Sequence, residues 1–154
     1  MPQTPLLLEP ACVRAHAPAQ SRKRALEIAA GLLAARHPGL AERALLEEFL
    51  KREDLGSTGI GEGVAIPHCR IDCPAVVAAL ISLDAGIDYE AIDDQPVDLL
   101  FVLVVPTAET DAHLNLLATL AGIFSEASNR RSLRAETDDL ALWERMQELL
   151  AAAG

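Results

Sequence analysis

The stretch VDLLFVLVVP, residues 97–106, decides the fold class. It is apolar at every position except Asp98 and partly β-branched, which is typical of a strand buried on both faces. The stretch AVVAALISL, residues 75–83, repeats this pattern between Pro74 and Gly86. Two strands of this kind need helices on both sides of their sheet. The sequence therefore predicts an α/β fold, a three-layer sandwich with a mixed central sheet and helices on both faces.

Apolar residues at helical spacing predict the covering helices. Ser21 is a suitable cap for a helix over residues 22–36, and a second helix ends near Arg52. Two more are expected over residues 110–125 and 138–152, the last with Thr137 as its cap, and a short strand is expected over residues 12–16. With 51% hydrophobic residues and no linker or repeat, we expect one domain over residues 1–154 with a core over about 12–150.

Charge and composition exclude several classes of function. The net charge of −10 argues against binding to nucleic acid or anionic membranes, which requires a basic surface. Between Glu53 and Asn129 the only lysine or arginine is Arg70, so the middle of the chain favours a basic partner. Because neither a signal peptide nor a long apolar run is evident, we expect a cytoplasmic protein without membrane insertion, whose three cysteines are reduced.

The glycine-rich stretch STGIGEGVAIPH, residues 57–68, is the candidate site. It lacks the Gly-Lys-Ser/Thr of a phosphate-binding loop, and it leads into an extended segment instead of opening a helix, which argues against a dinucleotide site. What remains is a tight loop whose backbone amides can face an anion. Pro67 restricts the backbone that presents His68.

A histidine presented in this way is a candidate nucleophile toward phosphorus if its ring is neutral and its tautomer is fixed. Loop donors at Ser57, Thr58 and Gly59, together with Arg52 and Arg70, are expected to stabilise the phosphoryl group. His113, near a helix N-terminus, is a second candidate, as a neutral hydrogen-bond donor. The alternative is that both histidines serve only as loop or capping residues.

A metal site is a further candidate. Cys69 and Cys73 together with the two histidines supply metal-ligating atoms, but the Cys-x3-Cys spacing is unusual for zinc. We therefore expect neither a metal nor an organic cofactor.

The stretch REDLGSTGIGEGVAIPH, residues 52–68, resembles the active-site signature of the type-2 enzyme IIA domains of the bacterial phosphoenolpyruvate-dependent phosphotransferase system, the fructose–mannitol class. AIDDQPVDLLFVLVVP (91–106), HLNLLATLA (113–121) and SRKRALEIAAGLL (21–33) are similar to further blocks of this family. The likeness runs from about Cys12 to Trp143. It is closest to the nitrogen-regulatory branch, often called PtsN.

The resemblance implies roles for three residues. His68 takes the place of the phosphorylated histidine, which receives its phosphoryl group from an HPr-type phosphocarrier protein. His113 matches the second active-site histidine, and Arg52 matches the arginine close to the site. Cys69-Arg70 replaces the Gly-Lys that is common in the nitrogen branch, which keeps the positive charge.

Two functions remain open at this point. In the nitrogen branch, the phosphorylation state regulates the binding of downstream proteins. In the alternative, a sugar-specific enzyme IIA passes the phosphoryl group to a IIB domain for sugar uptake.

Three cations, Arg22, Lys23 and Arg24, lie in the first turn of the first helix, where they oppose its dipole. Either they form a solvated face, or they contact an acidic partner.

Overall fold

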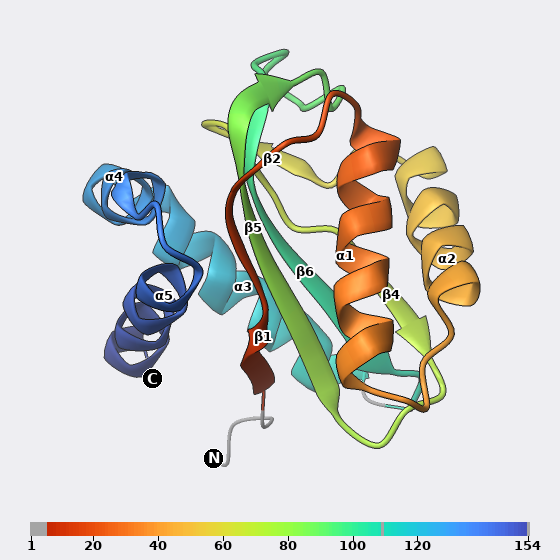
Figure 1. The fold of residues 1–154 in the computed structure, drawn as a ribbon. Helices are drawn as coiled ribbons and strands as arrows, with labels where there is room; N and C mark the ends of the chain where they lie inside the picture. The colour runs from red at the N-terminus through yellow and green to blue at the C-terminus, as the bar shows by residue number, and fades with distance from the viewer. Residues whose placement is uncertain (1–5, 109, 154) are drawn as a thin grey trace.

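The structure is a computed structural model that describes residues 6–108 and 110–153, and it confirms the α/β class. A sheet lies in the middle, with α1 and α2 on one face and α3, α4 and α5 on the other (Figure 1). The strands are β1 (Leu6–Ala17), β2 (Gly59–Gly61), β3 (Val64–Ala65), β4 (His68–Ile71), β5 (Val76–Ile87) and β6 (Val97–Pro106). The helices are α1 (Arg22–Arg36), α2 (Glu42–Asp54), α3 (Thr110–Ser125), α4 (Ala127–Ala135) and α5 (Asp139–Ala153).

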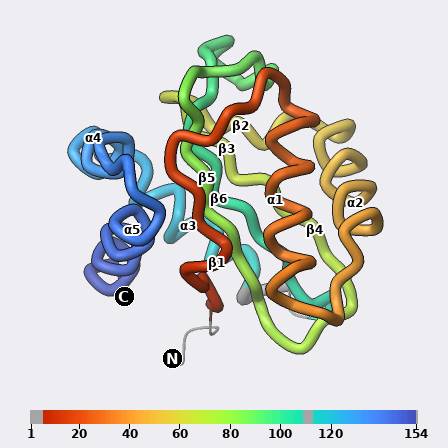
Figure 2. The backbone as a smooth tube through the Cα atoms, in the orientation of Figure 1, coloured from red at the N-terminus to blue at the C-terminus, as the bar shows by residue number. Residues whose placement is uncertain are grey.

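The sheet is mixed, as the sequence predicts. Its strand order is β1-β5-β6-β3-β2, and β4 also pairs with β6. The β1–β5, β3–β6 and β4–β6 pairs are parallel, whereas β5–β6 and β2–β3 are antiparallel. Figure 2 shows β1 running beside β5. Strands β5 and β6 have neighbours on both sides, which explains why they are the most apolar segments of the chain.

Alternate residues of β6 belong to two different cores. Leu100 and Val102 pack with the side chains of α1 and α2, which include Phe49. Leu99 and Phe101 pack with those of α3, α4 and α5. This period of two is the geometry of a strand, and it is why both faces of the sheet need apolar residues.

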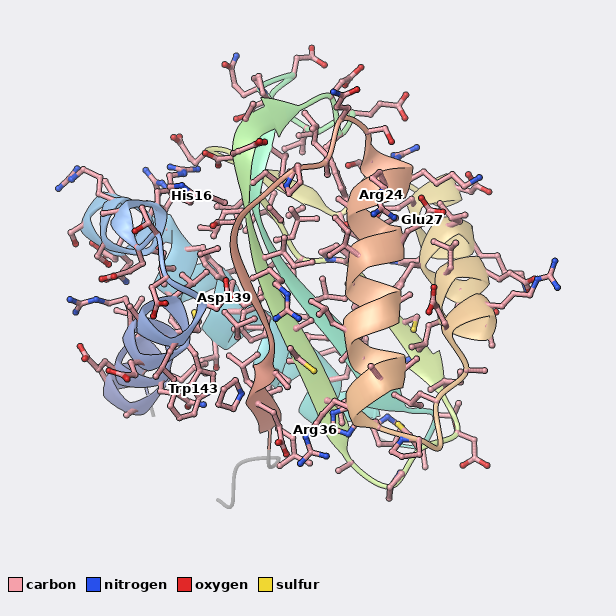
Figure 3. All side chains as sticks on the ribbon, in the orientation of Figure 1. His16, Arg24, Glu27, Arg36, Asp139 and Trp143 are labelled. Carbon is pink, nitrogen blue, oxygen red and sulfur yellow. The ribbon has the colours of Figure 1, made fainter. Side chains whose placement is uncertain are left out.

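Helix α5 covers part of the edge strand β1. The Trp143 indole donates a hydrogen bond to the Leu8 carbonyl at 2.8 Å, and the Ala15 amide donates to Asp139 Oδ1 at 2.7 Å. Figure 3 shows Trp143 and Asp139 on α5, close to this strand. These contacts satisfy backbone groups that an edge strand otherwise leaves unpaired.

Several details differ from the sequence prediction. Strand β1 is longer than the predicted residues 12–16, because its first residues pair with β5 although their own pattern is irregular. Helix α4 was not predicted, since it is short and mostly polar and Leu133 is its only buried residue. Asp138, not Thr137, caps α5 by accepting a hydrogen bond from the Ala141 amide at 3.0 Å. The predicted Ser21 cap of α1 is confirmed.

Within residues 6–108 and 110–153, no helix combines the length and the apolar character that crossing a membrane requires.

Candidate functional site

His68 begins β4, in register with Leu103 of β6. Its Nδ1 lies 2.8 Å from the Ile66 carbonyl oxygen. A carbonyl oxygen only accepts hydrogen bonds, so Nδ1 carries the proton in this contact. The second ring nitrogen, Nε2, accepts a hydrogen bond from Arg52 Nε at 3.3 Å. The two contacts fix one tautomer, in which Nε2 holds a lone pair.

Arg52 lies in the last turn of α2. Its Nη1 donates a hydrogen bond to the Gly56 carbonyl at 2.8 Å while its Nε faces His68. Gly56 has φ +141°, a conformation that favours glycine. The turn after α2 therefore holds the guanidinium group against the imidazole.

His113 of α3 stands beside His68. The ring centroids are 5.1 Å apart, and the ring planes meet at 70°. The residue is buried, and neither ring nitrogen finds a hydrogen-bond partner among the residues that the structure describes. Because buried polar groups are normally satisfied, these two nitrogens are candidate contacts for a polar ligand.

Both imidazoles favour the neutral form. Burial, together with smaller effects of the nearby His68, Arg70 and Arg52, lowers the pKa of His113 from 6.5 to about 4. Burial also lowers the pKa of His68, against the effect of its hydrogen bond to Ile66 and with a smaller contribution from Arg52. At neutral pH the site therefore presents an unprotonated nucleophile next to an uncharged second ring.

A pocket of about 320 Å³ opens over these rings. Lys51 and Arg70 lie at its wall together with Arg52, and Glu48 pairs with Lys51 at 3.1 Å, so the lining is net positive in a chain of net charge −10. Such a surface favours an anion. The lining residues are Glu48, Lys51, Arg52, Leu55, His68, Cys69, Arg70 and His113.

The predicted residues thus divide into two groups. The structure brings His68, His113, Arg52 and Arg70 together in the pocket. Glu48 and Lys51 of α2 and Leu55, which follows the helix, also line it. They were not predicted, because Glu48 and Lys51 have the pattern of a solvated helix face and Leu55 is a single apolar residue.

Ser57, Thr58 and Gly59 do not line this pocket, which corrects the expectation from the sequence. The Ser57 hydroxyl donates to the Tyr89 carbonyl at 3.0 Å and accepts from the Gly59 amide at 3.1 Å. The Thr58 amide donates to Glu53 at 3.0 Å. These donors are therefore occupied by internal contacts instead of facing an anion.

Close packing explains why residue 59 is a glycine. A Cβ atom there would lie 2.7 Å from the Ala91 Cβ, closer than side chains approach. This part of the glycine-rich stretch therefore lets β2 pack against residues 89–91.

The thiols next to the site are part of the core. Cys69 is buried, and burial raises its pKa to about 12. The Cys73 thiol donates to the Ala75 carbonyl at 3.3 Å. In the described part of the chain, no group of three or more His, Cys, Asp or Glu side chains is arranged to hold a metal ion.

Comparison with known proteins places these features in context. The sequence pattern of the family described as "Phosphoenolpyruvate-dependent sugar phosphotransferase system, EIIA 2" matches residues 6–148. The chain is 42% identical to the nitrogen regulatory protein of Pseudomonas aeruginosa over 139 residues, which cover 90% of each chain. It is also 42% identical to the nitrogen regulatory protein of Escherichia coli K12 over 135 residues, 86% of this chain and 82% of that one.

Solved structures show the same relationship. The nitrogen regulatory protein IIA-Ntr from Neisseria meningitidis superposes with a TM-score of 0.85 and 36% identity, over 93% of this chain and 95% of that chain. IIA mannitol from Escherichia coli shares the fold, with a TM-score of 0.74 and 20% identity over 94% of this chain and 99% of that chain.

Proposed function

Because the chain belongs to the EIIA 2 family of the phosphoenolpyruvate-dependent sugar phosphotransferase system, we propose that it is a nitrogen-regulatory phosphocarrier. His68 accepts a phosphoryl group from the phosphohistidine of an HPr-type carrier protein. The phosphorylation state then decides which downstream proteins the chain binds. The observation that carries this proposal is the fixed tautomer of His68, whose ring lies 5.1 Å from that of His113, centroid to centroid, with its lone pair on Nε2.

The transfer is a direct exchange between two imidazoles. The Nε2 lone pair of His68 forms the new N–P bond as the N–P bond of the carrier breaks, and that electron pair returns to the carrier's ring nitrogen. The proton on His68 Nδ1 stays in place, bonded to the Ile66 carbonyl, which stabilises the positive character that the ring gains. Since one phosphohistidine replaces another, the reaction is near balance and reversible.

The pocket supplies donors for the transferred group. The Nε–H group of Arg52 then donates to a phosphoryl oxygen instead of to His68 Nε2. The hydrogen bond from Arg52 Nη1 to the Gly56 carbonyl holds the guanidinium group in place during this change. His113, neutral at pH 7, donates one N–H to another oxygen, which gives this buried ring a partner that it does not find among the described residues. Arg70 and Lys51 at the wall add positive charge.

Phosphorylation changes the charge of the binding face. A phosphoryl group adds a charge of roughly −1.5 to −2 at neutral pH. Placed among Lys51, Arg52 and Arg70, it offsets the positive surface that the unphosphorylated pocket presents. Partners with acidic or apolar surfaces are then repelled, and basic ones are favoured.

The alternative is a sugar-specific enzyme IIA that passes the group to a IIB domain. The chain is 36% identical to a fructose-specific EIIA component of Haloferax volcanii, but only over 61% of its length. The relatives that match about 90% of the chain at 42% identity are nitrogen regulatory proteins, which favours regulation.

The test is the intact mass of the protein after incubation with phosphoenolpyruvate, enzyme I and an HPr-type carrier. We expect one acid-labile phosphoryl group on the wild type and none on His68→Ala. His16→Ala is the matched control, because His16 is an exposed histidine of β1 outside the pocket lining. Stoichiometric phosphorylation of His68→Ala would refute the assignment.

A second experiment separates the two functions. Both forms of the protein are offered a IIB domain and, separately, are used for affinity capture. Binding of proteins in only one phosphorylation state, without transfer to IIB, supports regulation. Rapid transfer to IIB supports the sugar alternative.

A further inference from the structure

Glu53 carries a buried carboxylate that the proposed chemistry does not use. It lies in the last turn of α2, directly after Arg52, and its side chain is 1% exposed. Removing a carboxylate from water is costly unless hydrogen bonds and an opposite charge compensate it. The contacts of Glu53 therefore indicate what the carboxylate does.

Three donors converge on the two carboxylate oxygens. The Thr58 amide donates to Oε1 at 3.0 Å, the Thr58 hydroxyl donates to Oε2, and the Tyr89 hydroxyl donates to Oε2 at 3.1 Å. Tyr89 is fully buried, and burial together with the Glu53 charge raises its pKa, so it remains a neutral donor. Glu53 thus connects the end of α2 with residues 58 and 89.

The compensating charge comes from the basic first turn of α1. Arg22 Nη1 lies 3.7 Å from Glu53 Oε1, and Arg22 Nη2 lies 2.9 Å from the Glu90 carboxylate. The guanidinium carbon is 5.7 Å from the centroid of the Tyr89 ring, a cation–π distance. Arg22 therefore has an internal acidic partner. This partner explains why one of the three cations in the first turn of α1 stands there although it opposes the helix dipole.

Glu53 also closes the turn that holds Arg52. Its backbone carbonyl accepts a hydrogen bond from the Gly56 amide at 3.0 Å, while its carboxylate accepts from the Thr58 amide. The Gly56 carbonyl, located between these two bonds, is the acceptor for Arg52 Nη1 at 2.8 Å. A shift of this turn would move the acceptor and with it the guanidinium group.

We propose that Glu53 is a positioning residue, whose buried carboxylate fixes the turn over residues 55–58 and so holds Arg52 against Nε2 of His68. The inference rests on the proposed function, because phosphoryl transfer is what gives the contact between Arg52 and His68 its role. An apolar side chain would fill the same space without a buried charge, but it would leave the Thr58 amide and the Tyr89 hydroxyl unsatisfied.

The test compares Glu53→Gln with Asp54→Asn. Both changes remove one negative charge from the end of α2, but Asp54 is exposed. Nitrogen NMR of the Arg52 Nε–H group and of the His68 ring, in the full protein without any phosphoryl donor, reports the positioning directly. We expect the Arg52 signal to shift and its exchange with water to accelerate in Glu53→Gln, whereas Asp54→Asn retains the wild-type spectrum.

Transfer kinetics supply the second measurement. With saturating phosphorylated carrier, transfer to Glu53→Gln is expected to be about tenfold slower than to the wild type. The KM for the carrier stays within about twofold, because a buried side chain does not touch the carrier. Tyr89→Phe removes one of the three donors, and we expect a loss of about threefold.

The outcomes separate the two proposals. A wild-type Arg52 signal and a wild-type rate in Glu53→Gln would overturn the positioning role. If Glu53→Gln does not fold, Tyr89→Phe takes its place in the test. An unchanged Arg52 signal in Tyr89→Phe would then overturn the positioning role of Glu53. If the wild type accepts no phosphoryl group, the proposed function fails, while the NMR comparison still tests the position of Arg52.

Discussion

Acid titration of His113 tests the buried arrangement of the two histidines. Folding lowers its pKa from 6.5 to about 4, and the residue is only 5% exposed. As the pH falls below 6.5, the unfolded chain takes up a proton that the folded protein refuses until about pH 4, so the free energy of unfolding decreases through this range. The interval is roughly 2.5 pH units at about 1.4 kcal/mol each, which gives a loss of about 3 kcal/mol.

The assay is urea unfolding of the wild type and of His113→Gln, followed by circular dichroism in buffers from about pH 7 to about pH 4. Acidification is expected to destabilise the wild type by about 3 kcal/mol more than the variant, since other groups titrate in both proteins. A direct NMR titration of the His113 ring provides a second value. Parallel stability curves for the two proteins, or a ring that titrates near 6.5, would refute the buried site.

Three further predictions concern the site and its support. Arg52→Lys is expected to slow phosphoryl transfer about 10-fold to 100-fold in a stopped-flow assay, because an ammonium group does not reproduce the two directed contacts of the guanidinium group; a wild-type rate would contradict this. Gly59→Ala is expected to cost about 1–3 kcal/mol in urea unfolding, since the new methyl group would meet Ala91; Gly39→Ala, which has open space, is the control, and equal stabilities would disprove the close approach. Cys69 is expected to resist iodoacetamide at about pH 8 in the native protein, because its thiol is buried with a pKa of about 12, and rapid labelling detected by peptide mass would show that the thiol is accessible.

The agreement between sequence and fold depends on strong local periodicity. The runs over residues 75–83 and 97–106 predicted the central strands, because a strand covered on both faces must be apolar at nearly every position. Ser21 and the apolar spacing after it predicted α1 for the same local reason. Helix α4 was missed because only Leu133 is buried.

The candidate site was predicted only in part. His68, His113 and Arg52 were candidates from the residue pattern, the family resemblance implied their roles, and they share one pocket in the structure. The roles of Ser57, Thr58 and Gly59 were not predictable, because their partners, Tyr89 and Glu53, lie on other segments of the chain. A glycine-rich loop looks the same in sequence whether its amides face a ligand or the protein itself.

The sequence by itself determined the fold class, the acidic character of the chain and the histidine at the end of the glycine-rich stretch. These properties follow from residue type and from spacing along the chain. Only the tertiary structure decided which nitrogen of His68 holds the lone pair, which ring stands beside it, and that Arg22 pairs with Glu53. The physical reason is that hydrogen-bond partners and burial depend on distances in space between residues that are far apart in the chain.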